Sequence, residues 1–389
     1  MNYFLLSSKM MRATATALAL MVMGCGDAGG ASETSASSSE TDPTTSDDPS
    51  TSTGVDTTGV PTTSDATGET TTGTTEASTT TGAAPGDGLF VVAVGEQGSI
   101  LHCSEDACES MSSPVESELD DVVVLAADRA FAVGSAGVVL AWDGAAWTAM
   151  DAPTEANLSA VAALDDQTLF VGGSDGTMLR WDGATWSEVE HPVQGASGQT
   201  VHEIAFAGPD FGLAVVSSFS ELGQSSILRW DGASWTSERE GMDNMLSSLA
   251  VASPAVAAAG GHAPTPDEPL NLLTRDGQAT WTRVEDIEER NFVTGASFAS
   301  ESFGMAVTDL SFGPRPPVLA LWDGATWTTQ DVQEPHTAVH LVDAELGFLV
   351  GWGDDDGAFV QRWKAGELKR LPTDSSATAL WGVDGIRLP

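Results

Sequence analysis

The sequence has almost no tyrosine and few basic residues. It holds one tyrosine, Tyr3, and 15 lysines and arginines against 56 aspartates and glutamates, which gives a net charge of −41. Residues 1–87 carry 11 of the acids and 2 of the bases, so residues 88–389 keep 45 acids and 13 bases. Nucleic acid and anionic lipid headgroups are therefore disfavoured partners. A solvated acidic surface typical of an exported protein explains this charge, and a cationic ligand is the alternative.

The sequence also lacks an apolar run long enough to span a bilayer, which takes about 20 residues. Its longest run, Ala13 to Met23, follows Lys9 and Arg12 and precedes a small residue, which is the pattern of a secretory signal. Val22-Met23-Gly24-Cys25 resembles the bacterial lipobox. This resemblance implies that Cys25 is the acylated first residue of the mature protein; the alternative is an ordinary signal peptide. We expect a lipoprotein signal peptide over residues 1–24 and a lipid anchor at the cell envelope, in the outer membrane or at the cell surface.

Residues 25–87 lack what a folded core needs. From 26 to 87 the chain contains no lysine, arginine or aromatic residue, and its only larger aliphatic side chains are Val55 and Val60. Such a composition predicts a disordered linker. A flexible coil of about 60 residues has a root-mean-square reach on the order of 40–45 Å, which would hold a folded body clear of a membrane.

What the sequence does have is one hairpin copied several times. Trp142–Trp147 reads WDGAAW, and the motif returns at Trp181–Trp186, Trp230–Trp235 and Trp322–Trp327. Asp-Gly between two aromatic positions is a strong turn signal, because glycine accepts positive φ and aspartate bonds the turn backbone. The two tryptophans should lie opposite each other on antiparallel strands, where such pairs contribute roughly 0.2–1 kcal/mol.

The spacing of this hairpin predicts the architecture. The motif aspartates fall at 143, 182, 231, 276 and 323, in steps of 39 to 49 residues, and each unit reads as four short strands. A period near 40 with four strands is typical of propeller blades. The first unit, from Gly88, lacks an innermost strand, and Thr378–Gly385 matches the start of a unit that has no continuation. We therefore predict an all-β, seven-bladed β-propeller over residues 88–389, closed by one blade split between the two ends.

Two cysteines replace the tryptophan pair in the first unit. Aligned with Leu140–Trp147, the segment Leu101–Cys108 places Cys103 and Cys108 at the two tryptophan positions. Opposed residues on antiparallel strands lie close enough for a disulfide, and export supplies an oxidising compartment. With Cys25 acylated, no cysteine is left as a catalytic thiol.

The hairpins resemble those of the BNR or Asp-box propellers, including photosystem II assembly factor-like proteins and bacterial WDG-repeat lipoproteins, over residues 88–389. Asp182-Gly183-Ala184-Thr185-Trp186 is close to an Asp-box, although its aspartate and glycine are adjacent. The enzymes among the Asp-box proteins, the sialidases, use a tyrosine nucleophile. Because Tyr3 lies in the leader, the resemblance implies no sialidase activity. A two-carboxylate glycosidase stays open, since that mechanism needs only acids at a suitable separation.

Two further groups of residues have metal-like patterns. His336 and His340 are four residues apart, but strand geometry separates such residues by roughly 13 Å, so we predict no metal site there. The acidic run Asp354–Asp356 reads as a hairpin loop, with a calcium-binding turn as the alternative. We predict no cofactor.

A ligand is expected where loops have grown. The connection between the second and third strands is short in most units but long in three consecutive ones, at Ser217–Ser226, Gly260–Asn271 and Thr308–Pro317. We predict that they form one patch on one face, because function gathers on such loops; drift in surface loops is the alternative. The candidate ligand-binding residues are Phe219, Glu221, His262, Asp267, Glu268, Phe312 and Arg315. We expect a monomeric, non-catalytic binding or scaffolding module for a protein or glycan, with a cell-surface carbohydrate-active enzyme as the alternative.

Overall fold

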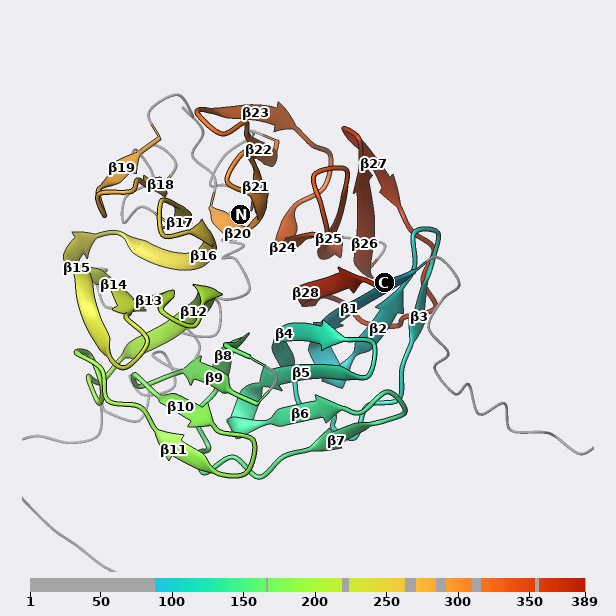
Figure 1. Cartoon of the computed structure of the whole chain (residues 1–389). Coiled ribbons are helices and arrows are strands. Elements are labelled where there is room, and N and C mark those ends of the chain that lie inside the picture. Colours follow the sequence, from blue (N-terminus) through green and yellow to red (C-terminus); the bar gives the residue numbers. More distant parts are fainter. Residues whose placement is uncertain are drawn as a thin grey trace, which may run out of the picture. The chain divides into compact units, whose positions relative to one another are not determined.

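The computed structural model describes residues 88–165, 167–218, 224–262, 271–284, 292–309, 316–353 and 357–388. Within these ranges the chain forms seven antiparallel sheets of four strands, arranged in a ring (Figure 1). The only helical segments there are the short 3₁₀ turns η1 (Glu96–Gly98) and η2 (Ser135–Gly137). The protein is therefore a seven-bladed β-propeller, as the repeats predicted.

Each blade except the first is made of four consecutive strands, from the inside of the ring outwards. Blade 2 contains β4 (Leu119–Ala126), β5 (Arg129–Gly134), β6 (Val139–Trp142) and β7 (Trp147–Ala149). Blade 3 contains β8 (Leu158–Ala163), β9 (Leu169–Gly173), β10 (Met178–Trp181) and β11 (Trp186–Glu188). Blade 4 contains β12 (Gln199–Gly208), β13 (Phe211–Ser218), β14 (Gln224–Trp230) and β15 (Trp235–Asp243).

The remaining complete blades follow in the same order. Blade 5 contains β16 (Met245–Ser253), β17 (Val256–His262), β18 (Asn271–Arg275) and β19 (Trp281–Arg283). Blade 6 contains β20 (Val293–Ser300), β21 (Phe303–Thr308), β22 (Val318–Trp322) and β23 (Trp327–Asp331). Blade 7 contains β24 (His336–Leu341), β25 (Leu346–Gly353), β26 (Gly357–Lys364) and β27 (Glu367–Arg370).

Blade 1 joins the two ends of the propeller. Its outer strands are β1 (Leu89–Gly95), β2 (Ile100–Cys103) and β3 (Cys108–Ser110), and its inner strand is β28 (Leu380–Arg387). β28 pairs antiparallel with β1, with Val92 opposite Asp384. The C-terminal strand thus supplies the inner strand that the first repeat lacks, and the predicted split-blade closure is confirmed.

The tryptophan hairpins have the expected register. Trp142 lies opposite Trp147, and the ring centroids of the four pairs are 5.3–5.7 Å apart. Asp143 Oδ1 accepts the N–H groups of Ala145 and Ala146 at 2.9 and 2.8 Å, and Gly144 has φ +90°. These backbone N–H groups hold the pKa of the Asp143 carboxyl below its usual value. The turn chemistry read from the sequence is the chemistry that closes the hairpin.

The first tryptophan also ties the hairpin to the turn between the first two strands. The Nε1–H of Trp142 donates to the Ala127 carbonyl at 2.9 Å, that of Trp230 to Pro209 at 3.0 Å, and that of Trp322 to Glu301 at 2.9 Å. A buried indole N–H needs such a partner. The repeated tryptophan is therefore a structural requirement of the blade.

In blades 1 and 5 the hairpin lacks the tryptophan pair, and other side chains occupy the same two positions. In blade 5, Arg275 lies opposite Trp281 and forms a buried ion pair with Glu238 at 2.8 Å. In blade 1, Cys103 and Cys108 are paired and form a disulfide with a Cα–Cα distance of 4.0 Å, as predicted. The disulfide hairpin also contacts the segment that leads to β28, because the Cys108 N–H donates to the Pro372 carbonyl at 2.9 Å.

The core lies between adjacent blades. Phe90 and Val92 of blade 1 pack with Trp142 and Trp147 of blade 2, and similar apolar clusters join the other blades. Close approach of the backbones requires glycine at Gly134, where an added Cβ would lie 1.9 Å from the Glu118 carbonyl oxygen. This packing fixes the inner strands around a common axis.

Candidate functional site

Every inner strand carries a β-bulge near its start. In blade 2, Leu119 lies opposite Gly134 and Asp121 opposite Val133, so Asp120 is the extra residue. A bulge bends a strand and re-aims the side chains that follow it. The extra residues, taken around the ring from blade 1, are Trp381, Asp120, Ser159, His202, Ser247, Thr294 and Thr337.

Several bulge side chains link one blade to the next. Thr294 Oγ1 donates to the His336 carbonyl at 2.6 Å, and Thr337 Oγ1 donates to the Leu380 carbonyl at 2.6 Å. Trp381 Nε1–H donates to Glu118 Oε1 at 2.7 Å. The inner strands of blades 6, 7, 1 and 2 are therefore joined by side-chain hydrogen bonds as well as by apolar packing.

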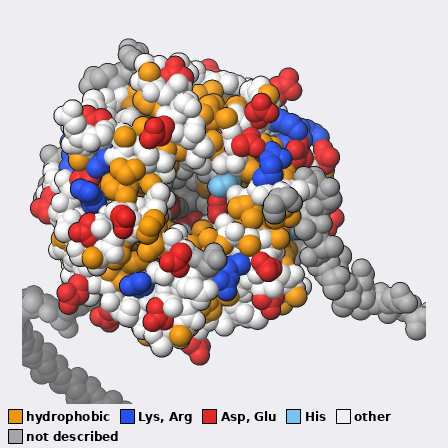
Figure 2. Space-filling view, in the orientation of Figure 1, with side chains coloured by type: hydrophobic (Ala, Val, Ile, Leu, Met, Phe, Trp, Pro, Cys, Tyr) orange, Lys and Arg blue, Asp and Glu red, His pale blue; other side chains and the backbone are white. Residues whose placement is uncertain are grey.

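The inner strands surround a cavity of about 330 Å³. Figure 2 shows it as a hollow at the centre of the ring. The third residue after each bulge lines it in all seven blades; these residues are Val123, Ala162, Ala205, Ala250, Ser297, His340 and Asp384. Asp121 and Glu203 also line the cavity, and no lysine or arginine is among its described lining residues. The cavity wall therefore combines acidic side chains with apolar ones.

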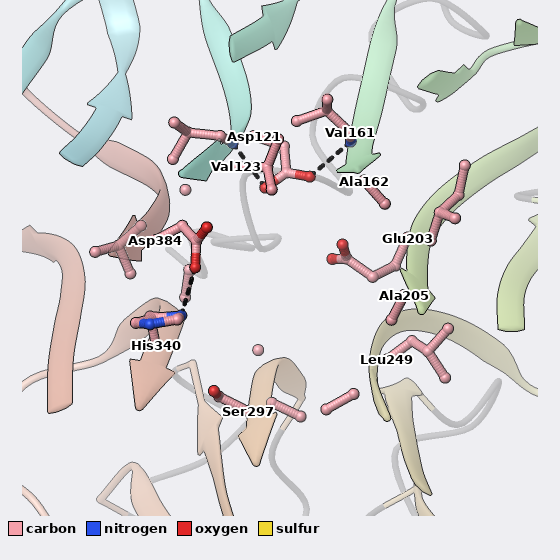
Figure 3. A pocket seen from close by; sticks show the side chains of 18 of the residues that line it. Asp121, Val123, Val161, Ala162, Glu203, Ala205, Leu249, Ser297, His340 and Asp384 are labelled. Carbon is pink, nitrogen blue, oxygen red and sulfur yellow. Dashed lines mark hydrogen bonds and ion pairs between the residues drawn. The ribbon is translucent and has the colours of Figure 1, made fainter. Parts of the chain in front are cut away.

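Asp121 bridges two blades at this wall. Its Oδ1 accepts the N–H of Val122 at 2.9 Å, and its Oδ2 accepts the N–H of Val161, on the inner strand of blade 3, at 2.8 Å (Figure 3). Both carboxylate oxygens are thus hydrogen-bond acceptors for backbone groups. The side chain satisfies N–H groups of inner strands that have no further strand beside them.

Asp384 and His340 form an ion pair between blades 1 and 7. Asp384 Oδ1 lies 2.6 Å from His340 Nδ1, and Asp384 Oδ2 accepts the N–H of Val124 in blade 2 at 2.6 Å. Burial pushes the pKa of the His340 imidazole down, but the Asp384 carboxylate and a hydrogen bond to the Gly385 backbone outweigh it and raise the pKa above its usual value. One carboxylate therefore joins three blades.

The third acid approaches the cavity from blade 4. Figure 3 shows the carboxylate of Glu203 directed into the cavity, on the wall opposite Asp384 and His340. On the blade 6 wall, Ser297 Oγ accepts the N–H of Leu341 at 3.0 Å, so this hydroxyl also serves a neighbouring inner strand. Most polar groups at the cavity wall thus have partners in the ring itself.

The predicted ligand-binding patch is largely outside the described residues. Phe219, Glu221, Asp267, Glu268, Phe312 and Arg315 are not described, nor is the acidic run Asp354–Asp356. Their assignment to a binding face stays a prediction, and so does the acylation of Cys25.

His262, the one described member of that patch, lies at the end of β17. Its ring meets Phe292 edge-on, with centroids 4.0 Å apart. Burial lowers the pKa of the imidazole to about 4, so His262 is neutral at physiological pH.

The long connections are shorter than the sequence suggested, because the flanking strands continue into them. Ser217 pairs with Ser225, and their hydroxyls bond the backbone of Leu246 in blade 5 at 3.0 and 2.9 Å. Thr308 ends β21 and its hydroxyl bonds Val318. The connections between second and third strands in blades 4, 5 and 6 are 219–223, 263–270 and 309–317, against 96–99, 135–138, 174–177 and 354–356 in blades 1, 2, 3 and 7.

Sequence reasoning missed the residues of the axial cavity. Asp121 and Glu203 directly follow the bulges of their strands, whereas His340 and Asp384 are the third residues after theirs. Alignment of the inner strands on their bulges places Asp121 with Glu203, and His340 with Asp384. The bulge hides this signal, because it shifts the alternation of inward and outward side chains by one residue.

Metal and membrane features are absent from the part of the chain that the structure describes. There, no three His, Cys, Asp or Glu side chains gather as a metal site would require. His336 and His340 have different partners, Gln361 and Asp384. No helix in the described ranges has the length and apolar character of a membrane span.

Comparison with known proteins finds similarity in structure alone. No protein-family model matches the chain, and no curated protein matches its sequence. The structure of YCF48 bound to D1 peptide is 14% identical with a TM-score of 0.51, and the match covers 73% of this chain and 89% of that chain. The WD40 β-propeller domain of Doa1 is 15% identical with a TM-score of 0.53, covering 75% and 90%.

An enzyme is also among the similar structures. The GH74 xyloglucanase from Xanthomonas campestris is 15% identical with a TM-score of 0.52, and the match covers 76% of this chain but 54% of that enzyme. The chain therefore spans about half the length of the xyloglucanase. At these identities the likeness shows a shared propeller fold and not a shared activity.

Proposed function

We propose that this protein is an exported lipoprotein, anchored through Cys25 to the cell envelope, whose propeller is a non-catalytic binding module for a protein or glycan. The role of a binding module is supported by the propeller YCF48, which binds a D1 peptide. The export and the anchor are supported by the leader sequence that ends in Val22-Met23-Gly24-Cys25. The acidic surface makes a cationic partner group the more specific form of this proposal.

The observation that carries the binding proposal is the uneven length of equivalent connections. In blades 1, 2 and 3 the second and third strands are joined by four residues, whereas blades 4, 5 and 6 use five, eight and nine. Equivalent connections of a propeller emerge on one face, so the three extensions belong to one sector of that face. Longer connections cost closure entropy without adding core, and a binding role accounts for their presence in neighbouring blades.

A two-carboxylate glycosidase is the competing proposal, supported by acids in the axial cavity and by the likeness to a xyloglucanase. Such an enzyme needs one carboxyl group that carries a proton to the leaving group. Both oxygens of Asp121 and both oxygens of Asp384 already accept hydrogen bonds or an ion pair from the ring. This engagement favours a structural role for these two acids.

Replacement of the three connections tests the binding proposal. A variant with Gly-Ser-Asp-Gly in place of 219–223, 263–270 and 309–317 should fold and should bind envelope partners at least about tenfold more weakly, which is 1.4 kcal/mol. A matched control exchanges Ser135–Val138 for the equivalent Ser174–Thr177 turn of blade 3. Equal affinity in both variants would refute the site, and glycan hydrolysis that is lost in Glu203→Gln would support the enzyme instead.

A further inference from the structure

The inner strand of blade 1 is held without a short covalent link to the rest of its blade. β28 pairs with β1, which lies almost three hundred residues earlier in the chain. All other blades are closed by hairpins between consecutive strands. The stability of the ring therefore depends on the contacts that fix β28 against β1 and against the two neighbouring blades.

Asp384 makes the most extensive of these contacts. From the middle of β28 it reaches His340 on β24 of blade 7 with one oxygen and the N–H of Val124 on β4 of blade 2 with the other, both at 2.6 Å. Figure 3 shows the ion pair at the wall of the axial cavity. We call these three groups the closing clasp; they are the His340 ring, the Asp384 carboxylate and the Val124 N–H.

The clasp is built for a charged histidine. One ring nitrogen of His340 faces Asp384, and the imidazole also bonds the backbone of Gly385 on the same strand. An imidazolium carries an N–H on both ring nitrogens and acts only as a donor, which suits a side chain that faces a carboxylate and a backbone acceptor. A charge-assisted hydrogen bond to a carboxylate is also about twice as strong as a neutral one.

Most of the other titratable groups near His340 are acids, which favour the positively charged form of its imidazole. β20, β21 and β25, which pack against β24, contain no titratable side chain. On β28, Arg387 is paired with Asp343 of the turn after β24, at 2.7 Å, and Glu345 follows in that turn. His336, at the start of β24, is kept neutral by burial, which lowers its pKa to about 4. Across the cavity stand the acids Asp121 and Glu203.

We propose that the closing clasp is a pH-dependent lock on ring closure, tight while His340 is protonated and loosened when it loses its proton. Deprotonation removes the ion pair to Asp384 and leaves the imidazole with a single N–H, so its hydrogen bonding to β28 is no longer charge-assisted. β28 keeps its other links to blade 7, through Thr337 and Asp343, and its link to Val124 of blade 2, but its attachment to blade 7 is weaker. The seam between blades 7 and 1 is therefore the part of the ring that opens first as the pH rises.

The direction of the pH effect follows from the sign of the shift. The pKa of His340 in the folded protein is raised above its ordinary value of 6.5. The stabilisation is therefore fully present below pH 6.5 and is lost as the pH rises through the folded pKa. Histidines with lowered pKa values, such as His336, are neutral over this upper range and add no slope there.

Hydrogen exchange of the β28 amides, measured by mass spectrometry from pH 6 to pH 9 and corrected for chemical exchange rates, tests the lock. Protection of the peptide over Leu380–Arg387 should fall several-fold across this range, because the folded-state pKa of His340 is raised. Protection of β17, in blade 5, should stay constant. In His340→Gln, β28 should show reduced and pH-independent protection, while His191→Gln, which alters a buried histidine between blades 3 and 4, should behave as wild type.

Three results would overturn the proposal. One is constant protection of β28 from pH 6 to pH 9 in the wild-type protein, a measurement that requires no variant to fold. Another is a wild-type pH dependence that persists in His340→Gln or in Asp384→Asn. A folded-state pKa for His340 below 6.5 in a nuclear magnetic resonance titration would contradict it as well.

Discussion

The tryptophans of the repeated hairpins combine apolar packing with one directed hydrogen bond. Trp230 is 5% exposed, and its ring lies 5.3 Å from Phe170 of the preceding blade and 5.7 Å from Trp235. Its Nε1–H reaches the Pro209 carbonyl. A side chain with these contacts is part of the core between two blades, although it belongs to an outer hairpin.

Trp230→Ala should destabilise the protein by about 3–5 kcal/mol, because truncation removes a buried aromatic ring and leaves a cavity. Trp186→Ala, at a half-buried position of blade 3, should cost clearly less. The midpoints of urea unfolding of the two variants measure the difference. An equal loss of unfolding free energy in the two variants would mean that packing between blades does not determine how much each tryptophan stabilises the protein.

His336 gives stability a second pH dependence, opposite in sign to that of His340. The side chain is fully buried, and its Nε2 contacts Gln361 Oε1 at 2.9 Å. Burial lowers its pKa from 6.5 to about 4 despite that contact. The unfolded chain therefore binds more protons between pH 4 and 6.5, and stability rises with pH over this window.

The His336 contribution should amount to about 3 kcal/mol, at 1.4 kcal/mol per pKa unit. His336→Gln keeps a polar group opposite Gln361 but cannot take up a proton. We expect the difference in unfolding free energy between wild type and this variant to change between pH 6.5 and 4, and to be constant below pH 4. A constant difference over the whole range would show that His336 is not the titrating group.

At the scale of strands and blades, the repeats predicted structure best where each copy repeats the same hydrogen bonds. The Asp-Gly hairpins, the cysteine pair and the C-terminal inner strand all follow from register with a neighbouring copy. The bulge of each inner strand was not predicted, because an extra residue such as Asp120 leaves no mark in an apolar alternation. The strand continuations at Ser217 and Thr308 were missed because serine and threonine there bond neighbouring backbone instead of forming a loop.

Deletion of 378–389 should abolish cooperative folding. It removes β28, exposes the inner edge of β1 and removes Asp384 from the closing clasp. We expect aggregation or a broad thermal transition, measured by calorimetry and size-exclusion chromatography. Deletion of 388–389 leaves β28 complete and is the matched control; the same sharp transition in both truncated proteins would show that ring closure does not need this strand.

At the scale of the whole molecule, the sequence predicted the ring but not the arrangement of its polar interior. The acids of the axial cavity come from blades 1, 2 and 4. Only the closed ring brings Asp121, Glu203 and Asp384 around one cavity, with Glu203 on the wall opposite Asp384. The spacing of these three acids in the sequence does not predict that they line the same cavity. The greater length of the connections in blades 4, 5 and 6 could be predicted from the sequence, because each connection can be compared with its equivalents in the other repeats.

These two features divide the molecule by role. The axial residues have partners that hold blades together, as Asp121 does for blades 2 and 3 and Asp384 for blades 7, 1 and 2. The equivalent connections of blades 1, 2 and 3 are shorter, and so the fold does not require the extra length in blades 4, 5 and 6. We propose that partners bind at the connections of blades 4, 5 and 6 and not in the axial cavity.

Site-specific photo-crosslinking in intact cells tests this claim most directly. A photoreactive residue is placed singly at Glu221, Asp267 and Phe312, and as controls at Asp175 in the short turn of blade 3 and at Ala162 in the cavity. We expect a shared covalent adduct from the three connection positions and none from the two controls. An adduct that forms from Ala162 or Asp175 but from none of the three connection positions would contradict it.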